Sequence, residues 1–264
     1  MRDLPFRQVH LDFHTSEHVP AVGERFDPEQ FVGALKRGRV NSINVFAKCH
    51  HGWSYHPTDV GAARILLEQH VNFDVVDTSA DFERYRLLIL PDEVPLDDPA
   101  LRGKVETFIA GGGTLVLSGR SGMDAAGDEF LLDVGAEALG PSPWCPDYAA
   151  AGEAIREGLV AQPFVLYERA QRVRVTDGEV LAEGWRPYFN REFRHFCSHQ
   201  HTPPAEPAGY PAALRKGQVV YFAPPVFTAY REKGQQLVRD YVWAVIASVY
   251  GRLDVEVACP AWAG

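Results

Sequence analysis

Histidine and aromatic side chains gather at two places near the start of the chain, and their chemistry suits sugar binding. The set comprises His10, Asp12, His14, His50, His51, Trp53 and Tyr55. Imidazole nitrogens hydrogen-bond to hydroxyl groups, and an indole ring offers a flat apolar face on which a pyranose stacks. His14, His50, His51 and Trp53 are therefore predicted to bind substrate.

Hydrolysis of a glycosidic bond also needs two carboxylates about 5–10 Å apart, one on each side of the bond. Asp12 and Glu17 are the candidates near these histidines, and neither lies in a recognisable catalytic motif. The catalytic residues therefore stay unknown at the level of sequence.

A second group alternates possible metal ligands along the chain: His195, Cys197, His199 and His201. Zinc takes such ligands at about 2 Å, but an extended chain at roughly 3.3 Å per residue spreads them over about 20 Å. Only a coiled loop would collect them, so neither a metal site nor a cofactor is predicted. We expect His195, His199 and His201 to lie in an interface loop that packs on another subunit or a barrel mouth. A zinc site and a plain solvated loop are the alternatives.

The stretch Ser118-Gly-Arg-Ser-Gly follows a run of apolar residues. A nucleophile elbow has the pattern G-x-S-x-G, and here Val116 stands where the first glycine would be. Nucleophilic catalysis by Ser118 is therefore not expected. The turn remains a candidate for binding an anion at the carboxyl edge of a sheet.

The element that positions this turn is a strand–helix–strand unit in residues 86–122. Apolar runs at 86–90 and 114–117 are typical of strands buried on both faces. Between them, Asp98-Pro99 supplies a helix N-cap and a first-turn proline, and three glycines end the helix. Its apolar stripe comprises Leu101, Val105, Phe108 and Ile109. Such a unit predicts a parallel sheet.

A similar alternation opens the chain. Residues 9–13 and 43–47 are predicted strands, and Asp27-Pro28 begins a helix between them that ends near Gly38. Two strands of this kind with polar residues at their carboxyl ends are typical of the opening of a (β/α)8 barrel.

Further elements are predicted from periodicity and turn residues. We expect helices over 60–67, from 130 to 134 and over 230–250. Strands are expected at 73–76, 164–166, 172–175, 180–182 and 218–222. Asp177-Gly178 is predicted as a hairpin turn, and residues 190–209 as a long polar loop.

The composition is that of an ordinary globular protein, with 46% hydrophobic and 23% charged residues among 264. The formal net charge of -9 argues against nucleic acid and against an anionic membrane as partners. No apolar export signal is visible at the start, and the four cysteines form no CxxC pair. We expect a cytoplasmic protein with reduced thiols.

Residues 82–119, FERYRLLILPDEVPLDDPALRGKVETFIAGGGTLVLSG, resemble the trimerisation domain of bacterial β-galactosidases. The resemblance runs from about residue 58 to 254. It implies a flavodoxin-like parallel sheet, related to class I glutamine amidotransferases, that assembles as a homotrimer.

The runs HLDFHTSE and VFAKCHHGWSYHPT resemble the first two strand ends of a family of glycoside hydrolases. In that family an α-L-fucosidase-like barrel precedes a β-galactosidase-type trimerisation domain. The run AKCHHGW is similar to AKHHDGF, with which α-L-fucosidases hold the sugar, but this chain has no aspartate there.

The two resemblances imply three parts: a truncated barrel in residues 1–57, a trimerisation-like α/β domain in 58–254, and the start of a C-terminal segment in 255–264. A complete barrel takes about 250 residues. The join at His56-Pro57-Thr58 is therefore interpreted as an internal deletion of strands three to eight. The histidines at the start are then the sugar site of the intact family, or polar groups left at an unfinished barrel rim.

The sequence thus predicts a glycoside hydrolase-related protein, with fucoside- or galactoside-like substrates in the intact family and no activity of this chain alone. The alternative is a non-catalytic oligomerisation or scaffold module. Carbohydrate and further copies of the chain are the expected partners. Five aromatic residues outside the central unit are candidate interface anchors: Trp144, Trp185, Tyr188, Phe189 and Phe193.

Overall fold

The computed structural model describes residues 7–11, 24–45, 61–69 and 71–251. By its internal contacts the chain divides into two units, Met1–Asp59 and Val60–Gly264. The predicted join near residue 57 and the segment 255–264 lie outside the described residues. The division of the chain into a truncated barrel, a trimerisation-like domain and a further segment stays a prediction.

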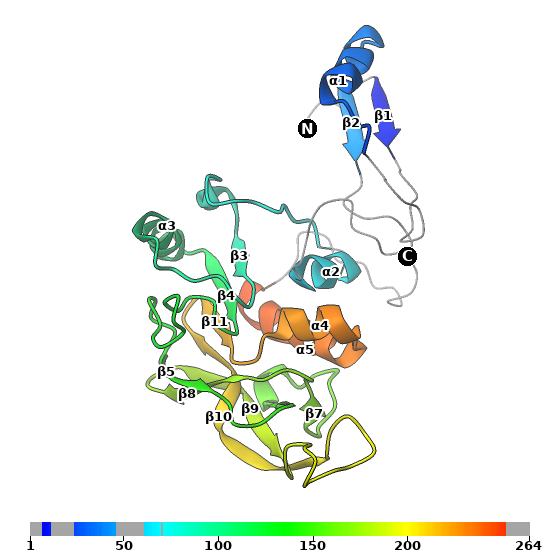
Figure 1. Cartoon of the computed structure of the whole chain (residues 1–264). Coiled ribbons are helices and arrows are strands. Elements are labelled where there is room, and N and C mark those ends of the chain that lie inside the picture. The colour runs from blue at the N-terminus through cyan, green and yellow to red at the C-terminus, as the bar shows by residue number, and fades with distance from the viewer. Residues whose placement is uncertain (1–6, 12–23, 46–60, 70, 252–264) are drawn as a thin grey trace. The chain divides into compact units, whose positions relative to one another are not determined.

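The first unit is a strand–helix–strand motif. Strands β1 (Gln8–Leu11) and β2 (Ser42–Val45) pair in parallel, joined through helix α1 (Pro28–Arg37), as Figure 1 shows. The predicted N-cap is confirmed, because the Asp27 carboxylate accepts hydrogen bonds from the amides of Glu29 (2.9 Å) and Gln30 (3.0 Å).

Helix α1 buries little of its apolar surface in the part of this unit that the structure describes. No residue of α1 is fully buried, and Val32, on the predicted apolar face, is 45% exposed. Phe31 and Leu35 are half-buried. A parallel strand–helix–strand motif occurs in barrels and in open sheets alike, so the barrel remnant stays a prediction.

The predicted central motif of the second unit is confirmed. Strand β3 (Leu87–Leu90), helix α3 (Pro99–Ala110) and strand β4 (Thr114–Ser118) follow one another, and β3 pairs with β4 in parallel. The Asp98 carboxylate caps α3 by accepting from the Ala100 amide at 2.9 Å. Every residue of β4 is buried, as expected of a strand covered on both faces.

The main sheet has seven strands in the order β3-β4-β11-β10-β9-β6-β7. The first three are parallel, and each of the remaining pairings is antiparallel. Strands β5 and β8 form a separate antiparallel pair. The bounds are β5 (Ala136–Pro141), β6 (Tyr148–Ala151), β7 (Phe164–Val165), β8 (Gln171–Val175), β9 (Glu179–Pro187), β10 (Pro204–Lys216) and β11 (Val219–Phe222). The class is therefore mixed α/β, and the flavodoxin-like assignment stays a prediction.

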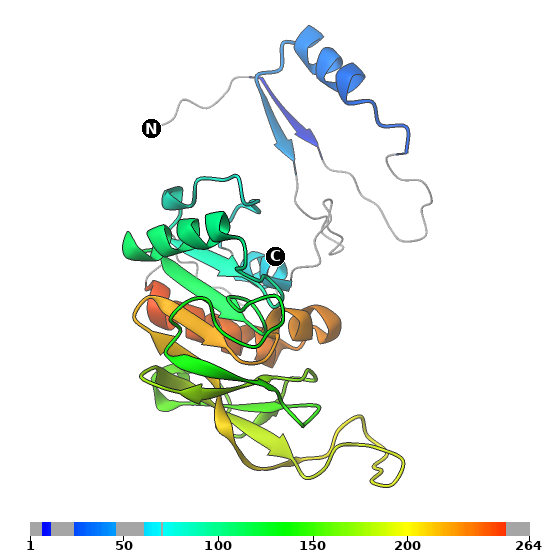
Figure 2. The same cartoon turned by 60° about the vertical axis from the view of Figure 1, so that its left-hand side comes forward.

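The sheet carries a core on each face, because side chains alternate along its strands. On one face, Val116, Val220 and Phe222 pack against helices; on the other, Leu115 and Leu117 belong to the core with α3. The helices of the first face lie together in Figures 1 and 2. They are α2 (Gly61–Glu68), α4 (Val226–Lys233) and α5 (Gln236–Tyr250); two short 3-10 turns span Phe82–Arg84 and Glu153–Ile155.

Three of the sequence predictions for the second unit are wrong in type. The predicted strand at 73–76 is irregular, and residues 130–134 form no helix, since Phe130 instead makes an isolated bridge with Met123. Asp177-Gly178 forms no hairpin, because β8 pairs with β5 whereas β9 pairs with β10 and β6. Short alternating runs carry no information about which strand is the partner.

Two further predictions are wrong in extent. The helix expected over 230–250 is two helices, because Gly234 adopts a left-handed conformation (φ 60°) that ends α4. The loop expected over 190–209 ends at Pro204, where the long strand β10 begins.

One carboxylate joins the three helices of the first face. Glu68 of α2 accepts hydrogen bonds from Arg64 at 2.9 Å, from Arg239 of α5 at 3.2 Å and from the Tyr230 hydroxyl of α4. Burial alone would raise the pKa of Glu68, but these three hydrogen bonds lower it below its usual value. The charged form is thus the one that the helices stabilise.

The contact between α2 and α4 leaves no room for a side chain at Gly61. A Cβ there would lie 1.9 Å from the Phe227 carbonyl oxygen. We expect Gly61→Ala to lower the free energy of unfolding by about 1–3 kcal/mol, because a helix must move. Urea unfolding measures the change. As the control, Gly103→Ala in α3, where an added Cβ meets nothing within 4 Å, should stabilise by up to about 1 kcal/mol. Equal effects at the two glycines would contradict this packing.

Candidate functional site

The carboxyl ends of the three parallel strands meet at one edge of the main sheet. Asp92 follows β3, Ser118 ends β4, and the chain leaves β11 to enter α4. Ligands of open α/β sheets usually bind at this edge, and the first turn of a helix there presents free amides to an anion. This edge is therefore the first place to look for a binding site.

A carboxylate of the protein itself occupies that position. Asp92 accepts hydrogen bonds from the Ser118 hydroxyl at 2.6 Å and from the Thr228 amide at 2.6 Å. The Phe227 amide approaches its other oxygen at 3.4 Å. The residue at the N-cap of α4 is Pro225, whose side chain caps nothing. From the turn after β3, far away in the sequence, Asp92 thus caps α4, and its negative charge suits a helix N-terminus.

The two serines of the predicted anion loop hold this arrangement. Ser118 is fully buried, and its oxygen accepts the Asp92 amide at 2.8 Å. Ser121, also fully buried, accepts the Val94 amide at 3.0 Å. Asp92 itself has φ 55°, a left-handed conformation that Asp tolerates better than most residues. Within the loop that the sequence offered for an external anion, Ser118 therefore donates to a carboxylate of the protein itself.

The predicted interface loop is a protrusion, residues 188–203, between β9 and β10. It leaves the sheet at the lower end of Figure 1. Its tip carries two exposed aromatic side chains, Phe193 (100% exposed) and Phe196 (65%), and Tyr188 (65%) lies at its start. Of the predicted anchors, Tyr188 and Phe193 are exposed, whereas Trp144, Trp185 and Phe189 are half-buried. Phe196 was missed, although its place in a run of polar residues pointed to exposure.

The potential metal ligands of this loop contact different partners and do not converge on one point. His195 pairs with Glu192 at 2.9 Å, and the Cys197 thiol contacts the His199 carbonyl at 3.3 Å. His199 is exposed, whereas His201 is half-buried against tyrosine rings. Among the described residues, no group of three or more His, Cys, Asp or Glu side chains is arranged to hold a metal ion.

A buried network beside the loop fixes its first stem. Asp147, 1% exposed, accepts hydrogen bonds from Tyr210 (2.6 Å), Ser142 (3.0 Å) and the Ala170 amide (2.8 Å). Burial raises the pKa of Asp147, and the hydrogen bonds offset only part of that effect. Asn190 extends the network into the loop by donating to the Pro143 carbonyl at 2.7 Å. Residues of this network such as Asp147 and Tyr210 lie too far apart in the sequence for a spacing pattern to indicate it.

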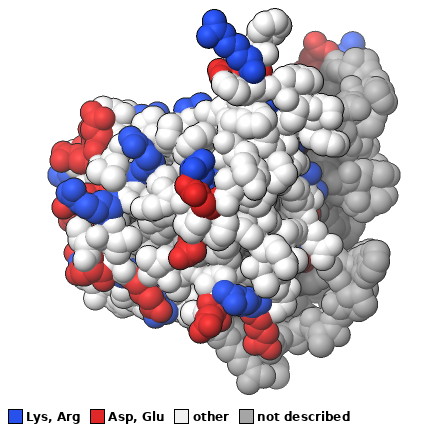
Figure 3. All heavy atoms as spheres, turned by 90° about the horizontal axis from the view of Figure 1, so that it is seen from below, with Lys and Arg blue, Asp and Glu red and all other residues white. Residues whose placement is uncertain are grey.

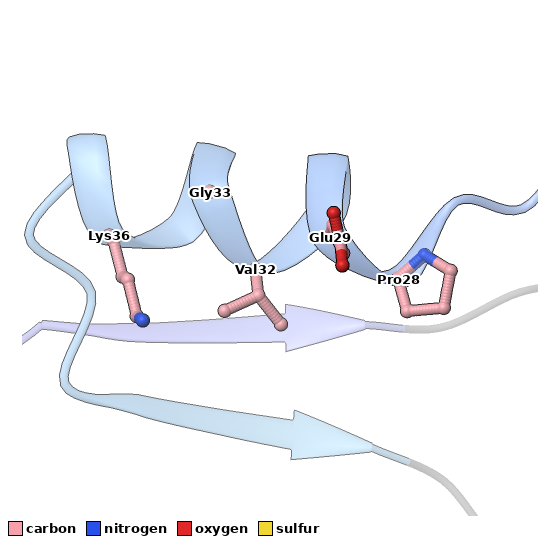
Figure 4. Close-up of a pocket in the computed structure, with 5 residues that line it drawn as sticks. All are labelled: Pro28, Glu29, Val32, Gly33 and Lys36. Carbon is pink, nitrogen blue, oxygen red and sulfur yellow. The ribbon is translucent and has the colours of Figure 1, made fainter.

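The predicted sugar-binding residues, His14, His50, His51 and Trp53, lie outside the described residues, as do Asp12 and Glu17. Their site stays a prediction. In the first unit an open groove runs along α1, and Figure 4 shows the lining side chains on one face of that helix. The lining residues are Pro28, Glu29, Val32, Gly33 and Lys36. Two apolar and two charged side chains on one exposed helix face give this groove no defined ligand chemistry.

Comparisons with known proteins place this architecture in a class. Residues 63–141 match the family model described as the beta-galactosidase trimerisation domain. The chain is similar to the alpha-L-fucosidase isoenzyme 2 from Paenibacillus thiaminolyticus, at 32% identity and a TM-score of 0.71, over 84% of this chain and 35% of that one. The predicted resemblance to glycoside hydrolases that carry such a domain is confirmed, and the chain has a glycoside hydrolase-related fold.

Two further solved structures are similar at lower scores. The beta-galactosidase from Rahnella sp. R3 shares 19% identity at a TM-score of 0.47, over 71% of this chain and 26% of that one. The exo-beta-1,4-mannosidase from Opitutaceae bacterium strain TAV5 shares 13% at 0.47, over 72% and 30%. A comparison with curated proteins gave no match. The chain spans about a third of the length of the alpha-L-fucosidase.

Within the described residues, none of the helices combines the length and the apolar character that crossing a bilayer requires. The cytoplasmic location stays a prediction. Cys145 and Cys197, the cysteines in this part of the chain, are both free thiols.

Removing the Asp92 carboxylate should cost more than removing an ordinary helix cap. Asp92→Ala leaves the Thr228 amide and the buried Ser118 hydroxyl without their acceptor, so we expect a loss of about 2–4 kcal/mol in unfolding free energy. Asp98→Ala, which removes the exposed cap of α3, should cost about 1 kcal/mol. Chemical denaturation of both variants compares them, and a loss at Asp92 no larger than at Asp98 would contradict the assigned role.

Proposed function

We propose that this chain is a glycoside hydrolase-related protein whose second unit is a self-association module, and that the chain alone does not hydrolyse glycosides. The observation that carries the proposal is the match of residues 63–141 to a trimerisation domain. By the likeness to an alpha-L-fucosidase and by the motifs around His14 and His50, the substrates of the intact family are fucoside- or galactoside-like.

The loop 188–203 supplies the contact surface in this proposal. When a partner covers large apolar side chains at a loop tip, binding is stabilised because their surface is removed from water. Phe193 and Phe196 are exposed at the tip and can be covered in this way. Figure 3, which views the molecule from below, shows acidic and basic side chains interspersed over a mostly uncharged surface. A partner that binds this face would therefore contact mainly apolar and neutral polar atoms, and it would not meet a surface that carries charge of a single sign. His195 and His199 lie on the same tip and complete the proposed interface.

We propose the absence of activity because the buried carboxylates of the described residues are engaged in structural hydrogen bonds. Asp92 caps α4, and Asp147 holds the stem of the loop. A glycosidase instead presents two carboxyl groups to the sugar, one of them free to give up a proton. Any catalytic pair of the intact family would belong to barrel strands three to eight. If residues 56–58 mark an internal deletion, as we interpret them, this chain has lost those strands.

The alternative function is a scaffold module without any role in catalysis. The two functions differ in their need for a sugar site. Binding of fucose or galactose by the purified chain, lost in His50→Ala or Trp53→Ala, would favour the hydrolase-related function, because a scaffold needs no such site.

Self-association is tested by light scattering coupled to size exclusion at micromolar concentrations, where we expect a trimer. Phe193→Ser combined with Phe196→Ser should raise the dissociation constant by a factor of about 30 or more, the effect of losing about 2 kcal/mol of interface contact. Val75→Ser is the matched control, since Val75 is 63% exposed on another segment. A monomeric wild type, or equal effects of the loop and control variants, would refute the module.

The absence of hydrolysis is tested with aryl α-L-fucosides and aryl β-galactosides. We expect product formation at the uncatalysed rate, because the barrel strands that would carry the carboxylate pair are removed in the proposed deletion, and with them the general acid that the leaving group needs. Turnover that disappears on replacing one acidic residue of this chain would overturn the proposal; turnover that survives every such replacement points to a contaminating enzyme.

A further inference from the structure

The second stem of the loop is docked through His201. The imidazole lies 5.0 Å from the ring of Tyr167 and 6.1 Å from that of Tyr148, steeply inclined to both (81° and 65°). Next to it, Thr202 is 3% exposed, its carbonyl accepts the Tyr148 hydroxyl, and its own hydroxyl donates to the Phe189 carbonyl at 3.2 Å. The two stems are thus tied together where His201 enters the domain.

The surroundings of the docked imidazole favour its neutral form. Nδ1 of His201 is buried and has no hydrogen-bond partner among the described residues. A neutral imidazole leaves one nitrogen without a proton, whereas the cation must donate from both. Protonation would therefore bury a charged N–H without an acceptor, an arrangement that folded proteins avoid.

The charge of a neighbouring histidine acts in the same direction. On the loop itself, His199 interacts with His201. From α4, the Lys233 ammonium lies 5.4 Å from the Tyr167 ring. Tyr148, whose pKa burial raises, is neutral near pH 7. Glu168, which follows Tyr167 in the sequence, is acidic, and a charged carboxylate would act in the opposite direction. Burial raises the pKa of Glu168, which weakens it as a counter-charge in acid.

We propose that His201 is an acid-sensitive latch: its neutral ring docks the second stem of loop 188–203 between Tyr148 and Tyr167, and its protonation releases that stem. The direction follows from linkage. Burial, and then the charge of His199, lower the pKa of the docked His201 below its usual value, so the released loop binds the proton more readily. Docking is complete above about pH 6.5, the usual histidine value, and weakens as the pH falls below it. The latch does not depend on self-association.

Hydrogen exchange of the backbone amides tests the latch between pH 7.5 and 5.0, after correction for the intrinsic pH dependence of exchange. In the wild type, corrected exchange in residues 188–203 should rise several-fold in acid, up to about tenfold for each unit by which the pKa is lowered. His201→Phe keeps an aromatic ring that has no ionisable nitrogen, so the corrected exchange rate of the loop in this variant should not change with pH. His199→Gln, at an exposed position of the same loop, should retain the rise.

A wild-type loop whose exchange does not change with pH would overturn the latch, and so would an equal rise in His201→Phe. Should that variant fail to fold, the wild type decides alone by NMR titration of the His201 ring proton. A midpoint below that of His199 supports the latch, and one at or above it refutes it.

Discussion

The Asp92 carboxylate joins three elements of the second unit: it follows β3, accepts the hydroxyl at the end of β4 and caps α4. A buried negative charge is tolerated only where hydrogen bonds replace its lost hydration, so these elements must hold their positions together. The helices α2 and α5 depend on α4 in turn, through Glu68 and through the contact between Gly61 and Phe227. The carboxyl edge of the sheet is thereby committed to structure.

The self-association that we propose uses a different kind of surface, the tip of loop 188–203, where Phe193 and Phe196 are exposed. The stems of loop 188–203 are fixed by Asn190, His201 and Thr202, whereas Phe193 has no protection from water. Rigid stems reduce the entropy that a partner must overcome on binding the tip. In the latch that we propose, protonation of His201 in acid would release the second stem, and the entropic advantage of a fixed stem would then be lost.

The sequence predicts elements well where the signals are local. Asp27 and Asp98 mark helix starts because a cap is written in adjacent residues. Strand β10 escaped because prolines at 204, 207 and 211 argue against an inner strand; the structure accommodates them with irregular register at those positions. The Asp92–Thr228 contact joins residues 136 apart, and no spacing pattern reports such a pair. The sugar-binding histidines, predicted by motif alone, lie outside the described residues.

The backbone of Asp92 bears on how this domain would evolve. A φ of 55° suits glycine better than any other residue, and an aspartate codon becomes a glycine codon by one base change. That change would remove the carboxylate and leave the Thr228 amide, the Phe227 amide and the Ser118 hydroxyl facing the vacated space. A glycine turn in front of a helix N-terminus is the arrangement with which many α/β proteins hold phosphate. A glycine at position 92 would thus leave this edge with unpaired donors of the kind that such sites use.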